Sequence, residues 1–199
     1  MKKLLSLILS ALIICIFTAC GSSAENKQAP EEKVAAQEVQ TADKILVAYF
    51  SCTGNTKKVA EEVAEILNAD IFEIVPAQPY TPEDLDYNIE DCRANIEQKD
   101  SEARPKIEVD IKNFPQYKTI VIAFPIWWHE EPRIIDTFVE SHNFAGKVVV
   151  PVCTSGGSEI DTAEKNLKTL CKGADIKQGK RLGIISKDEV KAWLDSLKL

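Results

Sequence analysis

Hydrophobic and polar positions change in regular blocks along residues 44–199, and these blocks predict alternating strands and helices. Continuous apolar runs, which are typical of strands buried on both faces, occur at residues 45–51, 119–125 and 147–154. More polar runs at residues 70–76 and 175–185 predict two further strands at the edges of a sheet. Apolar residues at helical spacing predict the intervening helices, over residues 55–67, 83–100, 132–141, 160–171 and 189–197.

This alternation indicates five consecutive βα units, an arrangement that builds a parallel sheet with helices on both faces. We therefore predict an α/β fold with three α/β/α layers and a five-stranded parallel sheet. Because the two polar strands belong at the edges, the strand order 2-1-3-4-5 fits best. In such a sheet, ligands bind beyond the carboxyl ends of the strands, near the switch point between strands one and three.

The loop after the first strand is rich in small polar residues and leads into a helix. Its sequence, SCTGNT, supplies three hydroxyls, one amide and one glycine where free helix N–H groups and the helix dipole favour an anion. A helix that needs only an N-cap requires one such residue rather than a run of them. The pattern therefore predicts a phosphate site formed by Ser51, Cys52, Thr53, Gly54, Asn55 and Thr56. Neither the Walker A nor the GxGxxG pattern occurs, which disfavours magnesium-dependent nucleotide hydrolysis.

The loops after the third and fourth strands extend this candidate site. The third-strand loop places two indoles, each a flat stacking surface with one N–H donor, at the same edge of the sheet. The fourth-strand loop is polar and carries two glycines, which let main-chain N–H groups approach a ligand closely. The candidate residues are Pro125, Ile126, Trp127, Trp128 and His129 in the first of these loops and Thr154, Ser155, Gly156, Gly157 and Ser158 in the second.

Taken together, these motifs resemble those of the flavodoxin family. The SxTGNT segment is similar to the family's loop for the phosphate of FMN, and PIWW and TSGGS resemble the flavin loops of a short flavodoxin-like subfamily. The resemblance covers residues 44–199 and implies a flavodoxin-like fold, FMN as cofactor, and neither a catalytic side chain nor a metal. It also implies electron transfer or oxidoreduction with a redox partner protein or a small quinone-like acceptor. An FMN-dependent oxidoreductase and a non-catalytic flavin carrier both remain open.

The residues that follow the two indoles carry expectations of their own. His129 stands where the subfamily tends to have glycine, so its side chain either narrows the site and titrates beside the flavin, or is simply exposed. Glu130 and Glu131 come next, and carboxylates close to the flavin ring would lower its reduction potential.

A Cys-dependent phosphatase is the remote alternative. Cys52 and Lys58 imitate the Cys-x5-Arg loop of phosphatases, and a helix N-terminus lowers the pKa of a thiol. Lys58, however, lacks the guanidinium fork that grips a phosphoryl group at two points. This alternative also leaves the paired tryptophans unexplained.

The overall composition is that of a globular protein with an acidic surface. The 199 residues suit one domain with additional segments, and 45% of them are hydrophobic. The formal net charge of -7 argues against a nucleic-acid partner, which would require a basic face.

The first 43 residues differ from the rest of the chain. A basic start, an apolar run and a small-residue end predict a signal peptide over residues 1–19. The segment FTAC resembles the lipobox of bacterial lipoproteins, which implies that Cys20 is lipidated. Residues 20–43 then comprise the lipidated cysteine and a disordered tether, and residues 44–199 form the folded domain. We therefore expect an extracytoplasmic lipoprotein anchored to the membrane, and the alternative is an uncleaved N-terminal anchor.

Overall fold

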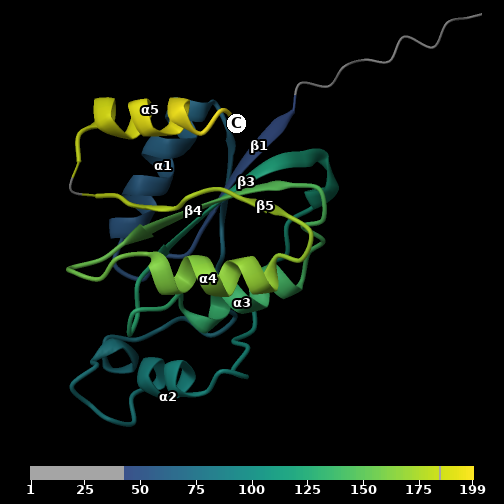
Figure 1. Cartoon of the computed structure of the whole chain (residues 1–199). Helices are drawn as coiled ribbons and strands as arrows, with labels where there is room; N and C mark the ends of the chain where they lie inside the picture. Colours follow the sequence, from purple (N-terminus) through teal and green to yellow (C-terminus); the bar gives the residue numbers. More distant parts are fainter. Residues whose placement is uncertain (1–42, 184) are drawn as a thin grey trace, which may run out of the picture. The chain divides into compact units, whose positions relative to one another are not determined.

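The computed structural model describes residues 43–183 and 185–199, so the predicted signal peptide and nearly all of the predicted tether lie outside the described residues. The described chain forms a parallel sheet with helices on both faces (Figure 1). The strand order is β2-β1-β3-β4-β5, which confirms the predicted fold class and winding. The strands are β1 (Lys44–Tyr49), β2 (Asp70–Glu73), β3 (Tyr117–Pro125), β4 (Val148–Thr154), β5 (Asp175–Ile176) and β6 (Lys180–Arg181).

The predicted fifth strand is split into β5 and β6, both of which pair with β4. Pairing stops beside Pro151, whose ring nitrogen has no hydrogen to donate. Gly179 passes this point closely, since a Cβ atom added there would lie 2.9 Å from the carbonyl oxygen of Pro151. The edge position is therefore filled by two short segments instead of one continuous strand.

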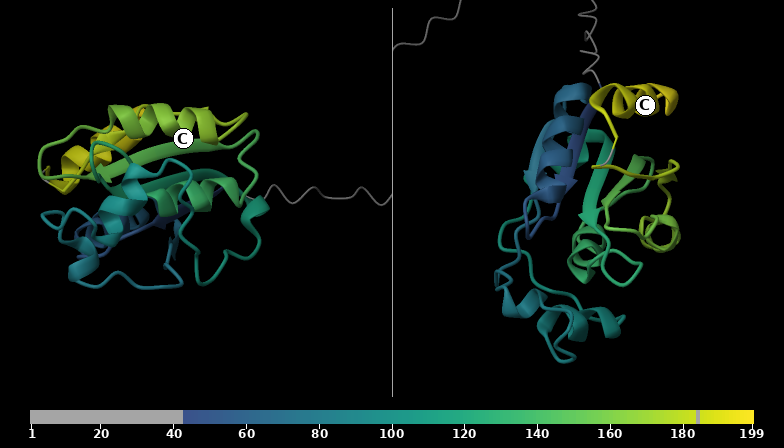
Figure 2. Two further views of the ribbon diagram at one scale, coloured as in Figure 1. Left: turned by 90° about the horizontal axis from the view of Figure 1, so that it is seen from below. Right: turned by 90° about the vertical axis from the view of Figure 1, so that its left-hand side faces the viewer.

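Four of the helices form two pairs, one on each face of the sheet (Figure 2). α1 (Asn55–Leu67) and α5 (Lys187–Ser196) cover one face, and α3 (Arg133–Glu140) and α4 (Asp161–Leu170) cover the other. Alternate residues of β1 join different cores: Leu46 packs toward α3 and α4, and Val47 packs toward α1 and α5. This double burial is the reason that the central strands read as unbroken apolar runs.

The helix predicted over residues 83–100 is wrong in its first half. The chain forms a 3-10 turn at Glu83–Leu85, and α2 begins only at Arg93 and ends at Lys99. Between them the Asp86 side chain accepts hydrogen bonds from the main-chain and side-chain nitrogens of Asn88, at 3.1 and 2.9 Å. Such a local side-chain bond competes with helix formation. Among the described helices, none combines the length and the apolar character that crossing a membrane requires.

Candidate functional site

A cavity of about 720 Å³ lies at the carboxyl edge of the sheet and is lined by all three predicted loops. Its volume is that of a typical small-molecule site. The site residues predicted from the sequence that line it are Ser51, Cys52, Thr53, Asn55, Thr56, Pro125, Ile126, Trp127, Trp128, Thr154, Ser155 and Gly156. Gly54, His129, Gly157 and Ser158 belong to the same loops but do not line the cavity.

The loop after β1 leaves the N-terminus of α1 open. The N-cap residue is Gly54, which adopts φ of +83°, and no side chain caps the helix. Ser51 folds back inside the loop, where its hydroxyl accepts a hydrogen bond from the Gly54 N–H at 3.1 Å. The first N–H groups of α1 therefore have no intrahelical or side-chain acceptor and are free for an anion. A plain capped helix start, the simpler interpretation of this loop, is thus excluded.

Thr154 connects the three loops. Its hydroxyl lies 2.8 Å from that of Thr56, which is only 2% exposed. Its carbonyl oxygen accepts a hydrogen bond from the Ile126 N–H at 2.9 Å. The walls of the cavity therefore keep a fixed relative position through one residue at the end of β4.

The segment after β3 is a tight hairpin that forces two bulky residues into the left-handed region. Trp127 and Glu130 exchange both main-chain hydrogen bonds, each 2.9 Å long. Trp128 and His129, between them, have φ of +47° and +69°. This pattern is that of a type I′ turn, which favours glycine and asparagine. The subfamily's glycine at the position of His129 is explained by this geometry.

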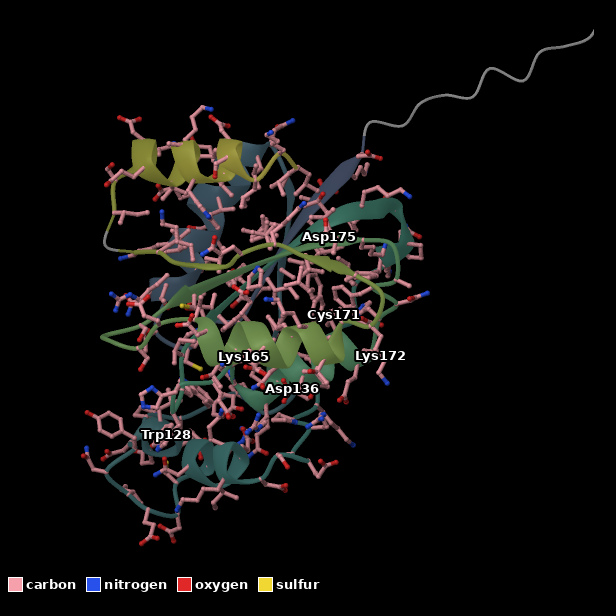
Figure 3. The ribbon with its side chains drawn as sticks, viewed as in Figure 1. Trp128, Asp136, Lys165, Cys171, Lys172 and Asp175 are labelled. Atoms are coloured by element: carbon pink, nitrogen blue, oxygen red, sulfur yellow. The ribbon has the colours of Figure 1, made fainter. Side chains whose placement is uncertain are left out.

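The two indoles of the hairpin have different environments. Trp127 is wedged between Phe50 and Tyr80, with ring centroids 5.7 and 5.4 Å apart. Trp128, labelled in Figure 3, is 49% exposed, and its ring lies 6.3 Å from that of Tyr87 in an edge-on arrangement. Trp127 therefore forms a fixed wall, whereas Trp128 presents a free aromatic surface at the mouth of the cavity.

His129 and the glycine loop contribute less than the sequence suggests. The Nδ1 atom of His129 lies 3.1 Å from the Ser158 hydroxyl, on the outside of the cavity. The Ser155 hydroxyl accepts hydrogen bonds from the N–H groups of Gly157 and Ser158, which shapes the loop. Neither Gly156 nor Gly157 has a positive φ or a neighbour within 4 Å of an added Cβ atom, so this structure does not itself require glycine there.

Several residues that line the cavity were not predicted. Leu85, Tyr87 and Ala94 come from the segment between β2 and β3, and others come from α1 and from the chain around α5. Sequence offered no signal for Tyr87, because it lies in a polar stretch whose position depends on how that stretch packs. The remaining lining residues are Lys58, Val59, Glu62, Val63, Leu182, Gly183, Ile185 and Val190.

Cys52 does not have the lowered pKa expected at a helix N-terminus. Desolvation of the thiol raises its pKa to about 12, and the nearby Arg93 guanidinium offsets only part of this effect. The side chain is at the surface, but the thiol stays protonated at neutral pH. Because the thiolate is the nucleophilic form, this environment disfavours the phosphatase alternative.

Glu130 and Glu131, which we expect close to the flavin ring, lie at the end of the hairpin and directly after it. Neither residue lines the cavity. Glu130 forms an ion pair of 2.7 Å with Arg133, and Glu131 is fully buried beneath the hairpin. Burial, with a smaller contribution from Asp136, raises the pKa of Glu131 to about 8. In the described part of the chain, no group of three or more acidic, histidine or cysteine side chains is arranged to hold a metal ion.

Comparisons with known proteins agree with this architecture. The family model described as flavodoxin matches residues 44–197. The crystal structure of a suspected flavoprotein from Bacteroides eggerthii DSM 20697 is 42% identical, with a TM-score of 0.76 over 78% of this chain and 98% of that one. A second, from Bacteroides uniformis ATCC 8492, is 45% identical, with a TM-score of 0.74 over 77% and 98% of the two chains.

A more distant crystal structure shares the fold. It is a flavoprotein from Lactobacillus acidophilus NCFM in complex with FMN, 23% identical, with a TM-score of 0.58 over 77% of this chain and 99% of that one. No curated protein sequence matches this chain significantly.

Proposed function

Because the chain belongs to the flavodoxin family, we propose that it is an FMN-binding electron-transfer protein that works at the outer face of the cytoplasmic membrane. The cavity shared by three loops at the carboxyl edge of the sheet is the observation that carries this proposal. FMN is the cofactor, which the flavodoxin family and the FMN complex of the Lactobacillus acidophilus flavoprotein both support.

The residues around the cavity suit the two chemically different ends of FMN. The uncapped N-terminus of α1, with the hydroxyls of Ser51 and Thr53 beside it, would hold the phosphate. Lys58, which also lines the cavity, adds a positive charge one turn further along the helix. The indoles of Trp127 and Trp128 would border the ring system at the opposite rim.

When bound, FMN supplies one- or two-electron chemistry, so the protein needs to bind and orient it. No histidine lines the cavity within residues 43–183 and 185–199, and the only histidine of the hairpin faces Ser158 instead. Trp127 is held by Phe50 and Tyr80 and keeps its wall in place. The exposed Trp128 leaves the mouth of the cavity open to an electron donor or acceptor.

A titration of the purified folded domain with FMN tests the cofactor site. We expect the flavin fluorescence to be quenched on binding, and Trp127→Ala to weaken binding at least tenfold because the wall beside the ring is lost. Trp193→Ala is the matched control, since Trp193 packs against the core formed with α5 and does not line the cavity. Absence of flavin binding by the wild-type protein would overturn the proposal.

Reduction assays distinguish an enzyme from a carrier. On FMN-loaded protein, rapid turnover with NAD(P)H and quinones would identify an oxidoreductase. A flavin that is photoreducible but inert to NAD(P)H would identify a carrier between protein partners. We favour oxidoreduction in the broad sense, because the partly exposed Trp128 beside Tyr87 offers a flat aromatic acceptor a surface on which to stack.

The proposed membrane anchor rests on the sequence of residues 1–20, namely the predicted signal peptide and the FTAC segment at its end. Two acyl chains on Cys20 would suffice for stable anchoring, whereas one would be marginal. Fractionation of cells and mass spectrometry of the mature N-terminus test this point. We expect wild-type protein in the membrane fraction with a diacylglyceryl group on Cys20, and release of Cys20→Ser from that fraction. An unmodified Cys20 would exclude the lipoprotein.

A further inference from the structure

Two carboxyl groups are buried together directly beneath the Trp127–Glu130 hairpin. Glu131 has no exposed surface, and Asp136, in the first turn of α3, is 3% exposed (Figure 3 labels Asp136). Two ionised carboxylates cannot share a buried site without a large energetic penalty. One of the two must therefore be matched by a cation or carry a proton.

Two arginines reach one member of this pair, Asp136, and each also contacts a carboxylate outside the pair. Arg133 contacts Glu130 at 2.7 Å and Asp136 at 3.4 Å. Arg104 contacts Glu140 at 2.7 Å and reaches Asp136 at 3.8 Å. Both guanidinium groups thus stabilise ionised Asp136, and no salt bridge reaches Glu131 in the described part of the chain.

Besides Asp136, the side-chain partner of the Glu131 carboxyl group in the described part of the chain is a neutral amide. The side-chain amide of Asn166, on α4, donates to Oε2 of Glu131 at 3.3 Å. Among the described residues, Oε1 of Glu131 and Oδ1 of Asp136 both lack a hydrogen-bond partner, and Asp136 contributes to the raised pKa of Glu131. A single proton between these two oxygens satisfies both. The arrangement places that proton on Glu131, since Asp136 has the two arginines.

This carboxyl pair is linked to the hairpin by two side chains. The Gln98 amide, on α2, donates to the main-chain oxygen of Glu131 at 2.9 Å and more weakly to that of Trp127 at 3.4 Å. Arg133 donates to the main-chain oxygen of Gln98 at 3.1 Å and to the carboxylate of Glu130. The hairpin, α2 and α3 therefore meet in one buried polar network.

We propose that Glu131 is a positioning residue: it shares one proton with Asp136, and this proton holds the Trp127–Glu130 hairpin in the conformation that receives FMN. Loss of the proton creates a second buried anion without a cation. The least costly response is for the segment carrying Glu131 to move toward water, which displaces the hairpin at its C-terminal end. Flavin binding then weakens as the pH rises through the range in which this proton is lost.

The other groups around Glu131 do not provide the same switch. α3 contributes Asp136, Arg133 and Glu140, the hairpin contributes Glu130, and the segment after α2 contributes Arg104. α2 contributes the neutral Gln98. α4 contributes the neutral Asn166, and Cys171 follows it with a thiol pKa raised to about 12 by burial. Burial raises the pKa of Glu131 to about 8 and also raises that of Asp136, whereas Arg133 and Arg104 act to lower the pKa of Asp136.

Flavin affinity measured against pH tests the link between the proton and the site. For the wild-type chain we expect the Kd for FMN to rise about tenfold between pH 7 and pH 9, as expected for a required proton lost near pH 8. Glu131→Gln, which has a similar shape and cannot ionise, should bind FMN with less than a twofold change over the same range. Glu130→Gln, in the same hairpin, should retain the wild-type pH dependence. The same pH dependence in wild type and Glu131→Gln would overturn the proposal.

Two measurements on the flavin-free protein separate this proposal from the proposed function. The infrared band of a protonated carboxylic acid should be present at pH 7 in the wild type and absent from Glu131→Gln. Near-ultraviolet circular dichroism of the Trp127 environment should change near pH 8 in the wild type alone. A missing band, or a dichroism signal independent of pH, overturns the shared proton or its coupling to the hairpin, whether or not FMN binds.

Discussion

Replacing His129 by glycine should stabilise the folded protein. His129 has φ of +69° in the two-residue turn between Trp127 and Glu130, a conformation that is unfavourable for L residues, although asparagine, aspartate and histidine adopt it more often than other residues. Its imidazole makes one hydrogen bond, to the exposed Ser158 hydroxyl, and does not line the cavity. The substitution therefore removes backbone strain and little else.

The size of the effect follows from three contributions. Relief of the left-handed conformation is worth about 1–2 kcal/mol. Introducing glycine lowers the free energy of unfolding by about 0.4–1 kcal/mol, because it increases the conformational freedom of the unfolded chain. The lost hydrogen bond to Ser158 is exposed and costs about 0.5 kcal/mol at most. We expect a net gain of about 0.5 kcal/mol in the free energy of unfolding, and at most about 1.6 kcal/mol.

Urea unfolding of the folded domain, followed by circular dichroism, measures this gain as a shift of the midpoint at constant m-value. His129→Ala is the matched control, because it removes the imidazole and retains a Cβ atom in the left-handed region. Asn68→Gly is a second control, since Asn68 has φ of +48° but asparagine tolerates that region. Equal stabilisation by His129→Ala and His129→Gly would refute backbone strain as the cause.

Three further substitutions test other parts of the structure. Glu131→Gln should raise the free energy of unfolding at pH 7 by about 3 kcal/mol. The Glu131 carboxyl group has a pKa of about 8 in the folded protein and of about 4.5 in the unfolded chain, so at pH 7 its ionisation favours the unfolded state of the wild type. Each pH unit above 4.5 contributes about 1.4 kcal/mol to this difference. The free energy of unfolding of the wild type should accordingly fall as the pH rises from about 4.5 to about 8. Urea unfolding at several pH values would contradict this if the free energy of unfolding had the same pH dependence in the wild type and in Glu131→Gln. Gly54→Ala should lower the free energy of unfolding by about 1 kcal/mol, because φ of Gly54 is +83° and L residues are strained there. An added Cβ atom has no neighbour within 4 Å, so backbone strain is the whole effect. An unchanged midpoint in urea unfolding would show that the loop relaxes freely. Thr154→Val should lower the free energy of unfolding by about 1–2 kcal/mol, because the buried hydroxyl of Thr56 loses its hydrogen-bond partner. The double variant Thr154→Val with Thr56→Val should lose less stability than the sum of the two single variants.

The apolar pattern of the sequence was sufficient to predict the sheet and the edge at which the candidate cavity lies. Strands β1, β3 and β4 are buried on both faces, so their sequences contain no polar alternation and stand out from the edge strands. Parallel strands have their carboxyl ends at one edge, and the three polar loops that follow them must therefore meet there. That inference uses only the order of elements along the chain.

Features that depend on contacts between distant segments could not be predicted in the same way. The helical pattern over residues 83–100 failed because local bonds at Asp86 break it, and the position of Tyr87 against Trp128 depends on the packing of that segment. The positive φ of His129 follows from the hairpin closed by Trp127 and Glu130.

Charge states show the same division between local and long-range information. A carboxylate close to two tryptophans looks exposed in the sequence, yet Glu131 is buried near Asp136, and burial raises its pKa. A cysteine at a helix N-terminus looks reactive, yet desolvation raises the pKa of Cys52. The sequence by itself determined which residues gather at the edge of the sheet, because strand order and direction follow from the hydrophobic pattern. Only the tertiary structure decided the solvation and charge of those residues, because burial depends on elements that are far apart in the chain.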